Sequence, residues 1–209
     1  MNLGRLSQLV QLAQFGARAW RAPLVLALVL VAVQLLGAPA REILSYDRAA
    51  ILTGGEYARL VTAHFVHYDQ THLAWNLVGL ALVAALFARE FDRRGWIVIL
   101  VAATVAVDLG FLVFEPQLEW YVGFSGVLHG LMAAGLCAWL WRTPDAITAL
   151  VAGLFALKLG WEHLVGPLPF TASTLAIPVV HQAHTYGAIG GAAAALWLLW
   201  RQRPAAPPL

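Results

Sequence analysis

Long apolar runs separated by short polar connections dominate the sequence. Six such runs occur, and most approach the ~20 residues that an α-helix needs to cross a hydrocarbon core about 30 Å thick. The fourth run is the shortest, at about 17 residues, so we expect it to start below the outer surface and to leave a cavity above its first turn. The pattern predicts six transmembrane helices over roughly 23–39, 72–90, 95–114, 125–141, 145–165 and 182–200.

The segments outside these runs predict one membrane domain with short extensions. Residues 1–22 place apolar side chains at helical spacing between arginines, which is typical of a basic, cytoplasmic interfacial helix. Residues 40–71 form the largest loop, and we expect it to lie partly in the membrane interface as a small element of its own. The proline-containing loop 166–181 is expected to be a mobile cap, and the tail 201–209 to be disordered. The all-α membrane domain is therefore assigned to residues 23–200.

The helix boundaries and the membrane orientation follow from local signals. Thr143-Pro144-Asp145 is expected to supply an N-cap, a first-turn proline and an acidic first turn to the fifth helix. Basic residues gather in the segments that flank one side of the predicted bundle, which predicts that both termini are cytoplasmic. The arginines of that side are Arg5, Arg18, Arg21, Arg89, Arg93, Arg94, Arg142, Arg201 and Arg203. The opposite side holds only Arg41, Arg48 and Arg59, in a loop that also contains acidic residues.

Composition supports a protein that lies in a lipid bilayer. Hydrophobic residues make up 61% of the chain and charged residues only 11%, whereas soluble domains carry about a quarter charged residues. The net charge of +2 is better explained by membrane topology than by nucleic acid, because the basic residues are scattered through short connections. Cys137 is the single cysteine, so an intramolecular disulfide is impossible.

Polar side chains inside the apolar runs are the candidates for function, because each is costly there unless it is paired or hydrated. Ser125 begins the fourth run between glycines, at a predicted helix N-terminus where free N–H groups can stabilise an oxyanion. His184 begins the sixth run, and topology places it near the same outer level as Ser125. The two form the minimal pair of nucleophile and base. Because no carboxylate accompanies His184 nearby in sequence, a dyad is the expected arrangement.

The second run supplies the expected oxyanion donors. His72 and Asn76 are four residues apart and therefore share one face of a helix. Together with the backbone N–H of Ser125 they are expected to bind the oxyanion, although they could instead tie the long loop to the fourth helix.

The motifs in these runs resemble those of the rhomboid intramembrane serine proteases. The nucleophile motif Gly-x-Ser-Gly, the second-span His-x-x-x-Asn and the sixth-span Ala-His-x-x-Gly-x-x-x-Gly occur in the family's order. The longer string Gly-x-Ser-Gly-Val-Leu-His-Gly is similar to the rhombosortase branch. The matching residues are Gly123, Ser125, Gly126, His129, Gly130, His72, Asn76, Ala183, His184, Gly187 and Gly191, together with Arg59 of the first loop.

The resemblance implies an activity, a substrate class and a location. Rhombosortases are understood to process proteins that carry a C-terminal Gly-Gly motif, a hydrophobic span and a basic tail, in the inner membrane of Gram-negative bacteria. Cleavage is then expected at the periplasmic face near the glycines, followed by hydrolysis or by transfer to an amine. The expected enzyme is a serine endopeptidase that needs no cofactor and no metal, with a membrane-anchored protein and the bilayer as partners and no nucleic acid.

Several residues keep two interpretations. His129 stands where common rhomboids have a tyrosine against the base histidine, and it either tunes His184 or is a satisfied core histidine. Lys158 and Glu162 are four residues apart, so they form a structural ion pair or recognise the substrate or an acceptor. Asp108 also needs a partner that the sequence does not name. Arg59, Gly187 and Gly191 are expected to be structural, the arginine as an anchor of the first loop and the glycines as sites of close helix contact.

Two other functions are also considered. The chain holds seven histidines, most of them near one face, which is compatible with a membrane protein that binds a metal or haem. His64 and His67 could begin such a site, but no acidic partners accompany them, and a metal site has no use for Ser125. An inactive rhomboid-like binding protein is disfavoured by the presence of both Ser125 and His184.

Overall fold

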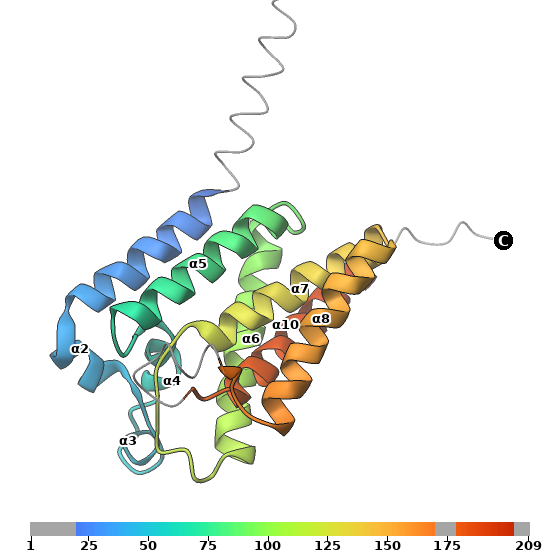
Figure 1. Ribbon diagram of the computed structural model, residues 1–209. Helices are drawn as coiled ribbons and strands as arrows, with labels where there is room; N and C mark the ends of the chain where they lie inside the picture. The colour runs from blue at the N-terminus through green and yellow to red at the C-terminus, as the bar shows by residue number, and fades with distance from the viewer. Residues whose placement is uncertain (1–19, 170–178, 203–209) are drawn as a thin grey trace, which may run out of the picture.

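The computed structural model describes residues 20–169 and 179–202. The expected interfacial helix at the N-terminus, most of the expected cap over 166–181 and nearly all of the tail fall outside these residues. Within them the chain forms a helical bundle (Figure 1). Its long helices are Trp20–Leu35, α5 (Gln70–Phe87), α6 (Arg93–Phe114), α7 (Ser125–Arg142), α8 (Ala146–Leu164) and α10 (Gln182–Arg201).

Each predicted apolar run contains one of these helices, but six membrane spans are not established. In the described part of the chain, α5, α6 and α8 are long and apolar enough to cross a membrane. A fourth span is added if Trp20–Leu35 and α2 (Gly37–Leu44) count as one bent segment. The number of spans and the orientation of the termini therefore stay predictions.

The first apolar run differs from the expected uninterrupted helix. Trp20–Leu35 and α2 meet at an angle of 108°, and Gly37 at the break has a φ of +74°. A side chain with a Cβ rarely adopts this backbone conformation, so Gly37 allows the turn. Only the last residues of the run, 37–39, lie in α2, which continues into the outer loop.

Aspartate side chains cap three of the long helices. Asp69 accepts a hydrogen bond from the His72 N–H at 2.8 Å, Asp92 from the Gly95 N–H at 2.7 Å, and Asp145 from the Thr148 N–H at 2.8 Å. The expectation that Thr143 is the N-cap of the fifth helix is wrong, because Asp145 occupies that position in α8. The hydrogen bond from Thr148 also lowers the pKa of the exposed Asp145 carboxyl.

The outer loop is built from short elements. It comprises α2, β1 (Tyr46–Asp47), α3 (Arg48–Leu52), α4 (Arg59–Thr62) and the 3₁₀ turn η1 (Ala63–Phe65). β1 pairs in antiparallel fashion with β2 (Trp120–Tyr121), the segment that leads into α7. The expectation of an all-α fold therefore needs this small correction.

Arg59 ties the outer loop together. Its guanidinium donates to the backbone carbonyls of Glu42 and Ser45, each at 2.9 Å, and pairs with the Glu56 carboxylate at 2.6 Å. These contacts join α2 to α4, next to the β1 strand that holds the segment before α7.

The helix α7 lies at the centre of the bundle, where it contacts α5, α6, α8 and α10 (Figure 1). Its contact with α10 depends on glycine. A Cβ at Gly187 would lie 1.9 Å from the Gly126 carbonyl oxygen, and a Cβ at Gly191 would lie 2.0 Å from the Gly130 carbonyl oxygen. Only glycine permits this approach, so the glycines of α10 allow the backbones of the two helices to pack in direct contact. The first turns of α7 and α10 are thereby held side by side.

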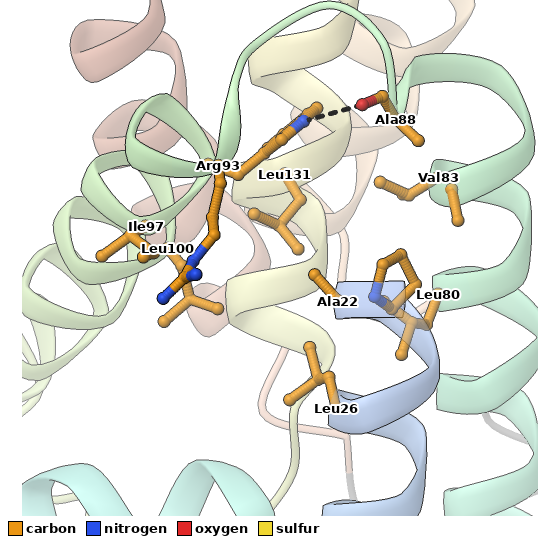
Figure 2. A pocket seen from close by; sticks show the side chains of 12 residues that line it. Ala22, Leu26, Leu80, Val83, Ala88, Arg93, Ile97, Leu100 and Leu131 are labelled. Carbon is orange, nitrogen blue, oxygen red and sulfur yellow. Dashed lines mark hydrogen bonds between the residues drawn. The ribbon is translucent and has the colours of Figure 1, made fainter. Parts of the chain in front are cut away.

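An apolar cavity of about 230 Å³ lies at the C-terminal end of α5, the end away from His72 (Figure 2). Trp20–Leu35, α5, α6 and Leu131 of α7 line it, and Arg93 is the charged residue of its wall. It contains neither Ser125 nor His184, so it is distinct from the cavity expected above the first turn of α7, which stays a prediction.

Candidate active site

Ser125 is the first residue of α7, as its glycine-flanked position predicts. The N-cap Phe124 supplies no side-chain hydrogen bond to the helix. The segment before it is fixed by a hydrogen bond of 3.1 Å from the Gly123 N–H to the Ala63 carbonyl. Gly123 has a φ of +128°, and a Cβ there would lie 2.8 Å from Nε2 of His72. Both the backbone conformation and the close His72 ring therefore require glycine at this position.

The His184 imidazole lies next to the Ser125 hydroxyl. Its Nε2 is 3.1 Å from Ser125 Oγ, although 59 residues separate the two in sequence. The side chain comes from the first turn of α10 and is buried, at 4% exposure. The glycine contacts between α7 and α10 hold the two residues at hydrogen-bonding distance.

A carboxylate lies on the other side of His184, contrary to the expectation of a dyad without an acidic partner. Glu162 Oε2 is 2.9 Å from His184 Nδ1. Because an ionised carboxylate only accepts hydrogen bonds, Nδ1 carries the proton in this contact, and Nε2 is left to accept from Ser125. The sequence did suggest a pairing for Glu162, through its spacing to Lys158, but not its contact with His184, because α8 and α10 come together only in the fold.

Lys158 and His129 complete the cluster. The Lys158 ammonium is 2.6 Å from Glu162 Oε2, contacts His129 Nε2, and lies 3.4 Å from His184 Nδ1. The His129 ring stacks on the His184 ring with centroids 4.0 Å apart and planes 14° apart. His129 Nδ1 is 2.7 Å from the Ser125 carbonyl oxygen, so it donates to that carbonyl, and Nε2 accepts from Lys158.

The expected oxyanion donors lie beside the segment that leads into α7. The His72 ring packs against Gly123, and its Nδ1 is buried with no hydrogen-bond partner among the described residues. Asn76 Nδ2 donates to the His72 carbonyl at 2.9 Å, within α5. This hydrogen bond uses one of the two Asn76 amide protons. The oxyanion role of His72 and Asn76 stays a prediction.

His64 and His67, from the outer loop, have neighbours of their own. His64 Nε2 is 3.2 Å from Asp108 Oδ1, so the partner that Asp108 required is a histidine of the outer loop. His67 lies edge-on to His72, with ring centroids 5.1 Å apart. Burial and the neighbouring His72 lower the pKa of the His67 imidazole to about 3, so this side chain is neutral at physiological pH.

The cluster at His184 has the residue types of a metal site, but its cation position is already taken. One ligand atom from each of His129, Glu162 and His184 lies within 4.8 Å of the others. The Lys158 ammonium contacts both His129 and Glu162. A metal ion here would have to displace the ammonium, so the geometry favours the lysine as the resident cation.

Comparison with known families agrees with the motif resemblance. The Rhomboid domain model matches residues 54–201, which include Ser125, Glu162 and His184. The chain therefore belongs to the rhomboid family. This membership and the apolar helices make it a multi-pass membrane protein.

A curated bacterial relative carries the same family description. The chain is 24% identical over 145 residues to "Putative rhomboid protease YdcA" of Bacillus subtilis, an alignment that covers 67% of this chain and 66% of the relative. The chain thus spans just under two thirds of the length of that protein.

Proposed function

We propose that this protein is an intramembrane serine protease in which Ser125 is the nucleophile and His184 is the general base. The single observation that carries the proposal is the 3.1 Å contact between Ser125 Oγ and His184 Nε2. The hydroxyl also lies at the first turn of a buried helix in a chain of the rhomboid family. A serine that is only a helix cap would not need a buried imidazole at this distance.

The chemistry follows from these positions. As Ser125 Oγ attacks the scissile carbonyl, its proton moves to His184 Nε2, and the carbonyl oxygen becomes an oxyanion. We expect backbone N–H groups at the start of α7 to stabilise that charge, assisted by His72, whose ring lies beside Gly123. The imidazolium then gives its proton to the leaving amine. The resulting acyl-enzyme is cleaved by water or by an amine acceptor.

The substrate class and location are proposed from the sequence resemblance. The string from Gly123 to Gly130 favours the rhombosortase branch, so we propose membrane-anchored proteins with a C-terminal Gly-Gly motif, a hydrophobic span and a basic tail. Cleavage would then occur at the periplasmic face of a bacterial inner membrane, because the arginine distribution predicts that the first turn of α7 lies on that side.

Co-expression with such a substrate tests the proposal. Wild-type protein is expected to release the substrate with a new C-terminus near the glycines, whose mass distinguishes hydrolysis from transfer to an amine. Ser125→Ala is expected to abolish release, whereas the control Ser45→Ala, in the outer loop, retains it. Equal processing by wild type and Ser125→Ala would contradict the proposed nucleophile.

A metal-binding function is the second candidate, favoured by the convergence of His129, Glu162 and His184. Elemental analysis of the purified protein separates the two. A stoichiometric transition metal that is lost in His129→Ala would support metal binding, and a metal-free protein that processes substrate would exclude it.

A further inference from the structure

We propose that Glu162 is a positioning residue that converts the Ser125–His184 pair into a triad, held in place by Lys158 and His129. This inference rests on the proposed protease function, and it assigns Glu162 a defined task in that reaction. The task is to hold the proton on His184 Nδ1, so that Nε2 always faces Ser125 as an acceptor.

The hydrogen-bond directions require this assignment. His184 Nδ1 has two neighbours, Glu162 Oε2 at 2.9 Å and the Lys158 ammonium at 3.4 Å. If Lys158 donated to Nδ1, the proton would lie on Nε2 and point at Ser125, which would prevent the imidazole from acting as base. The carboxylate is nearer and accepts only, so it selects the tautomer in which Nε2 accepts from the hydroxyl. Asp plays the corresponding part in other serine proteases.

The burial pattern of α8 indicates that Glu162 serves the candidate active site. Among the 19 residues of α8, only Thr148 and Glu162 are buried, and Glu162 is 0% exposed. Most of the helix is exposed apolar surface, yet it inserts an acidic side chain into the bundle beside His184.

Lys158 makes the buried carboxylate tolerable. An ionised carboxylate inside a membrane domain requires a paired cation, and the ammonium bonds to the same Oε2 atom that faces His184. Lys158 is the only lysine of the chain, whose other twelve basic residues are arginines. A compact ammonium can reach Glu162 and His129 from one point, whereas the flat guanidinium of arginine could not do so in the same space.

His129 stacks on the His184 ring and restricts its movement. Its own orientation is fixed at both nitrogens, by the Ser125 carbonyl and by Lys158. Its ring lies almost parallel to that of His184, at 4.0 Å. Rotation of the His184 ring about its χ angles is therefore restricted by a rigid neighbour. His129 thus replaces the packing that an aromatic side chain would give, and it also anchors Lys158.

The proton balance of the step leaves Glu162 ionised throughout. The proton that leaves Ser125 Oγ goes to His184 Nε2, and the Nδ1 proton stays between His184 and Glu162. The imidazolium is stabilised by the carboxylate until Nε2 gives its proton to the leaving amine. Glu162 neither gains nor loses a proton.

Kinetics of variants in detergent or vesicles test the assignment. Glu162→Gln is expected to lower kcat for a cleaved substrate by at least about a hundredfold with KM unchanged, because an amide can donate to Nδ1 and stabilise the wrong tautomer. Glu162→Asp is expected to recover part of this loss. The matched control Glu119→Gln, an exposed residue on the same side of the molecule, should cleave at the wild-type rate. A kcat of Glu162→Gln within threefold of wild type would overturn the assignment.

A second variant separates positioning from folding. In Lys158→Met/Glu162→Leu the buried ion pair is replaced by apolar side chains, so the protein is expected to fold while kcat stays at the level of Glu162→Gln. Wild-type kcat in this folded double variant would show that the pair is only structural.

A spectroscopic signature distinguishes failure of the triad from failure of the proposed function. The proton shared by His184 Nδ1 and a carboxylate should give a far-downfield imidazole signal in wild type and in Ser125→Ala, and it should be lost in Glu162→Gln. If wild type shows the signal but cleaves nothing, the protease function fails and the contact stands. If the signal is unchanged in Glu162→Gln, the contact itself is refuted.

The apolar cavity at the other end of α5 carries a second, independent inference. We infer that it binds one acyl chain of an anionic phospholipid, whose phosphate pairs with Arg93. The wall is apolar on Trp20–Leu35, α5 and α6, which suits an acyl chain and offers little to a polar ligand. The side chain of Arg93 extends beside Ile97 and Leu100 in Figure 2, and no described residue pairs with it.

Charge selects the lipid class. Arg93 lines the cavity, and Arg89 and Arg94 lie exposed in the same turnaround, so this end of the bundle is basic. On the predicted orientation this end faces the cytoplasmic leaflet, where anionic lipids gather. The only acidic residues of this turnaround are already engaged, Asp92 as the cap of α6 and Glu90 with Arg142. A lipid phosphate is therefore the fitting partner for Arg93.

Lipid-dependent stability tests the cavity. Thermal unfolding of the wild type is expected at a higher temperature in phosphatidylglycerol vesicles than in phosphatidylcholine vesicles. Arg93→Gln should lose most of this difference, as should Leu100→Trp, which fills the cavity. Arg94→Gln, the neighbouring control, should keep most of it. An equal loss in Arg93→Gln and Arg94→Gln would indicate surface charge alone and overturn the inference, as would no difference between the two lipids for wild type.

Discussion

At the scale of single residues, several polar side chains in or beside the apolar helices have a specific partner. His64 pairs with Asp108, His184 with Ser125, and Lys158 with Glu162. Only the last of these pairs can be predicted from spacing, because its members are four residues apart on one helix. The sequence named Ser125 and His184 through their motifs, but it could not supply Glu162 as a partner of His184, since that contact depends on how two helices pack.

Removal of Lys158 alone should be severe. Lys158→Met leaves the Glu162 carboxylate buried without a cation, so we expect the free energy of unfolding to fall by about 3–5 kcal/mol. Lys158→Met/Glu162→Leu should recover most of that loss, because no charge is then buried. Thermal or denaturant unfolding in detergent measures both. A single variant as stable as wild type would mean that the ammonium does not compensate the carboxylate.

The buried His67 should make the outer loop sensitive to acid. Its pKa is about 3 in the folded protein, because of burial and the nearby His72, and 6.5 is the ordinary value. Between these values the unfolded chain binds the additional proton, so stability falls as the pH is lowered, by up to about 1.4 kcal/mol per pH unit. Melting temperatures over this range should fall less steeply in His67→Gln than in wild type. Parallel slopes would show that His67 is not the group responsible.

At the scale of helices, the positions of the elements were largely predictable. Every apolar run contains a helix, and the glycines of the sixth run do approach another helix, since α10 meets α7 through Gly187 and Gly191. The bend at Gly37 and the β1–β2 pair were not predictable. A two-residue strand has no periodic pattern, and an apolar run carries no signal for the angle at which it turns.

The contact of α7 with α10 should tolerate no added atom. Gly191→Ala places a Cβ about 2.0 Å from the Gly130 carbonyl oxygen, so backbone must move and the pair Ser125–His184 must separate. We expect a loss of at least about 2 kcal/mol in unfolding free energy, together with loss of substrate cleavage. Gly153→Ala on α8, where a Cβ meets nothing within 4 Å, is the control and should be within about 1 kcal/mol of wild type. Equal stability of the two variants would contradict the close packing.

At the scale of the whole molecule, the outer loop and the candidate active site lie at one end of the bundle, and the arginine-rich connections lie at the other. The orientation stays a prediction, which rests on charge in loops rather than on packing. The substrate could be proposed only by resemblance, because no described contact names it.

Fusions to topology reporters should reveal the orientation. Green fluorescent protein fused to the C-terminus should fluoresce in bacteria, and alkaline phosphatase fused there should be inactive. Alkaline phosphatase inserted at the exposed Gly54–Gly55 turn of the outer loop should be active. The reverse pattern would place Ser125 at the cytoplasmic side and contradict the proposed periplasmic cleavage.

The most direct test of the central claim is the reaction of the purified protein with a fluorophosphonate, followed by mass spectrometry of its peptides. A serine activated by His184 should carry the phosphonate on Ser125 in wild type, the adduct should be absent in Ser125→Ala, and its rate of formation should fall strongly in His184→Ala. Folded wild-type protein that acquires no adduct at Ser125, or that reacts as fast without His184, would contradict the account.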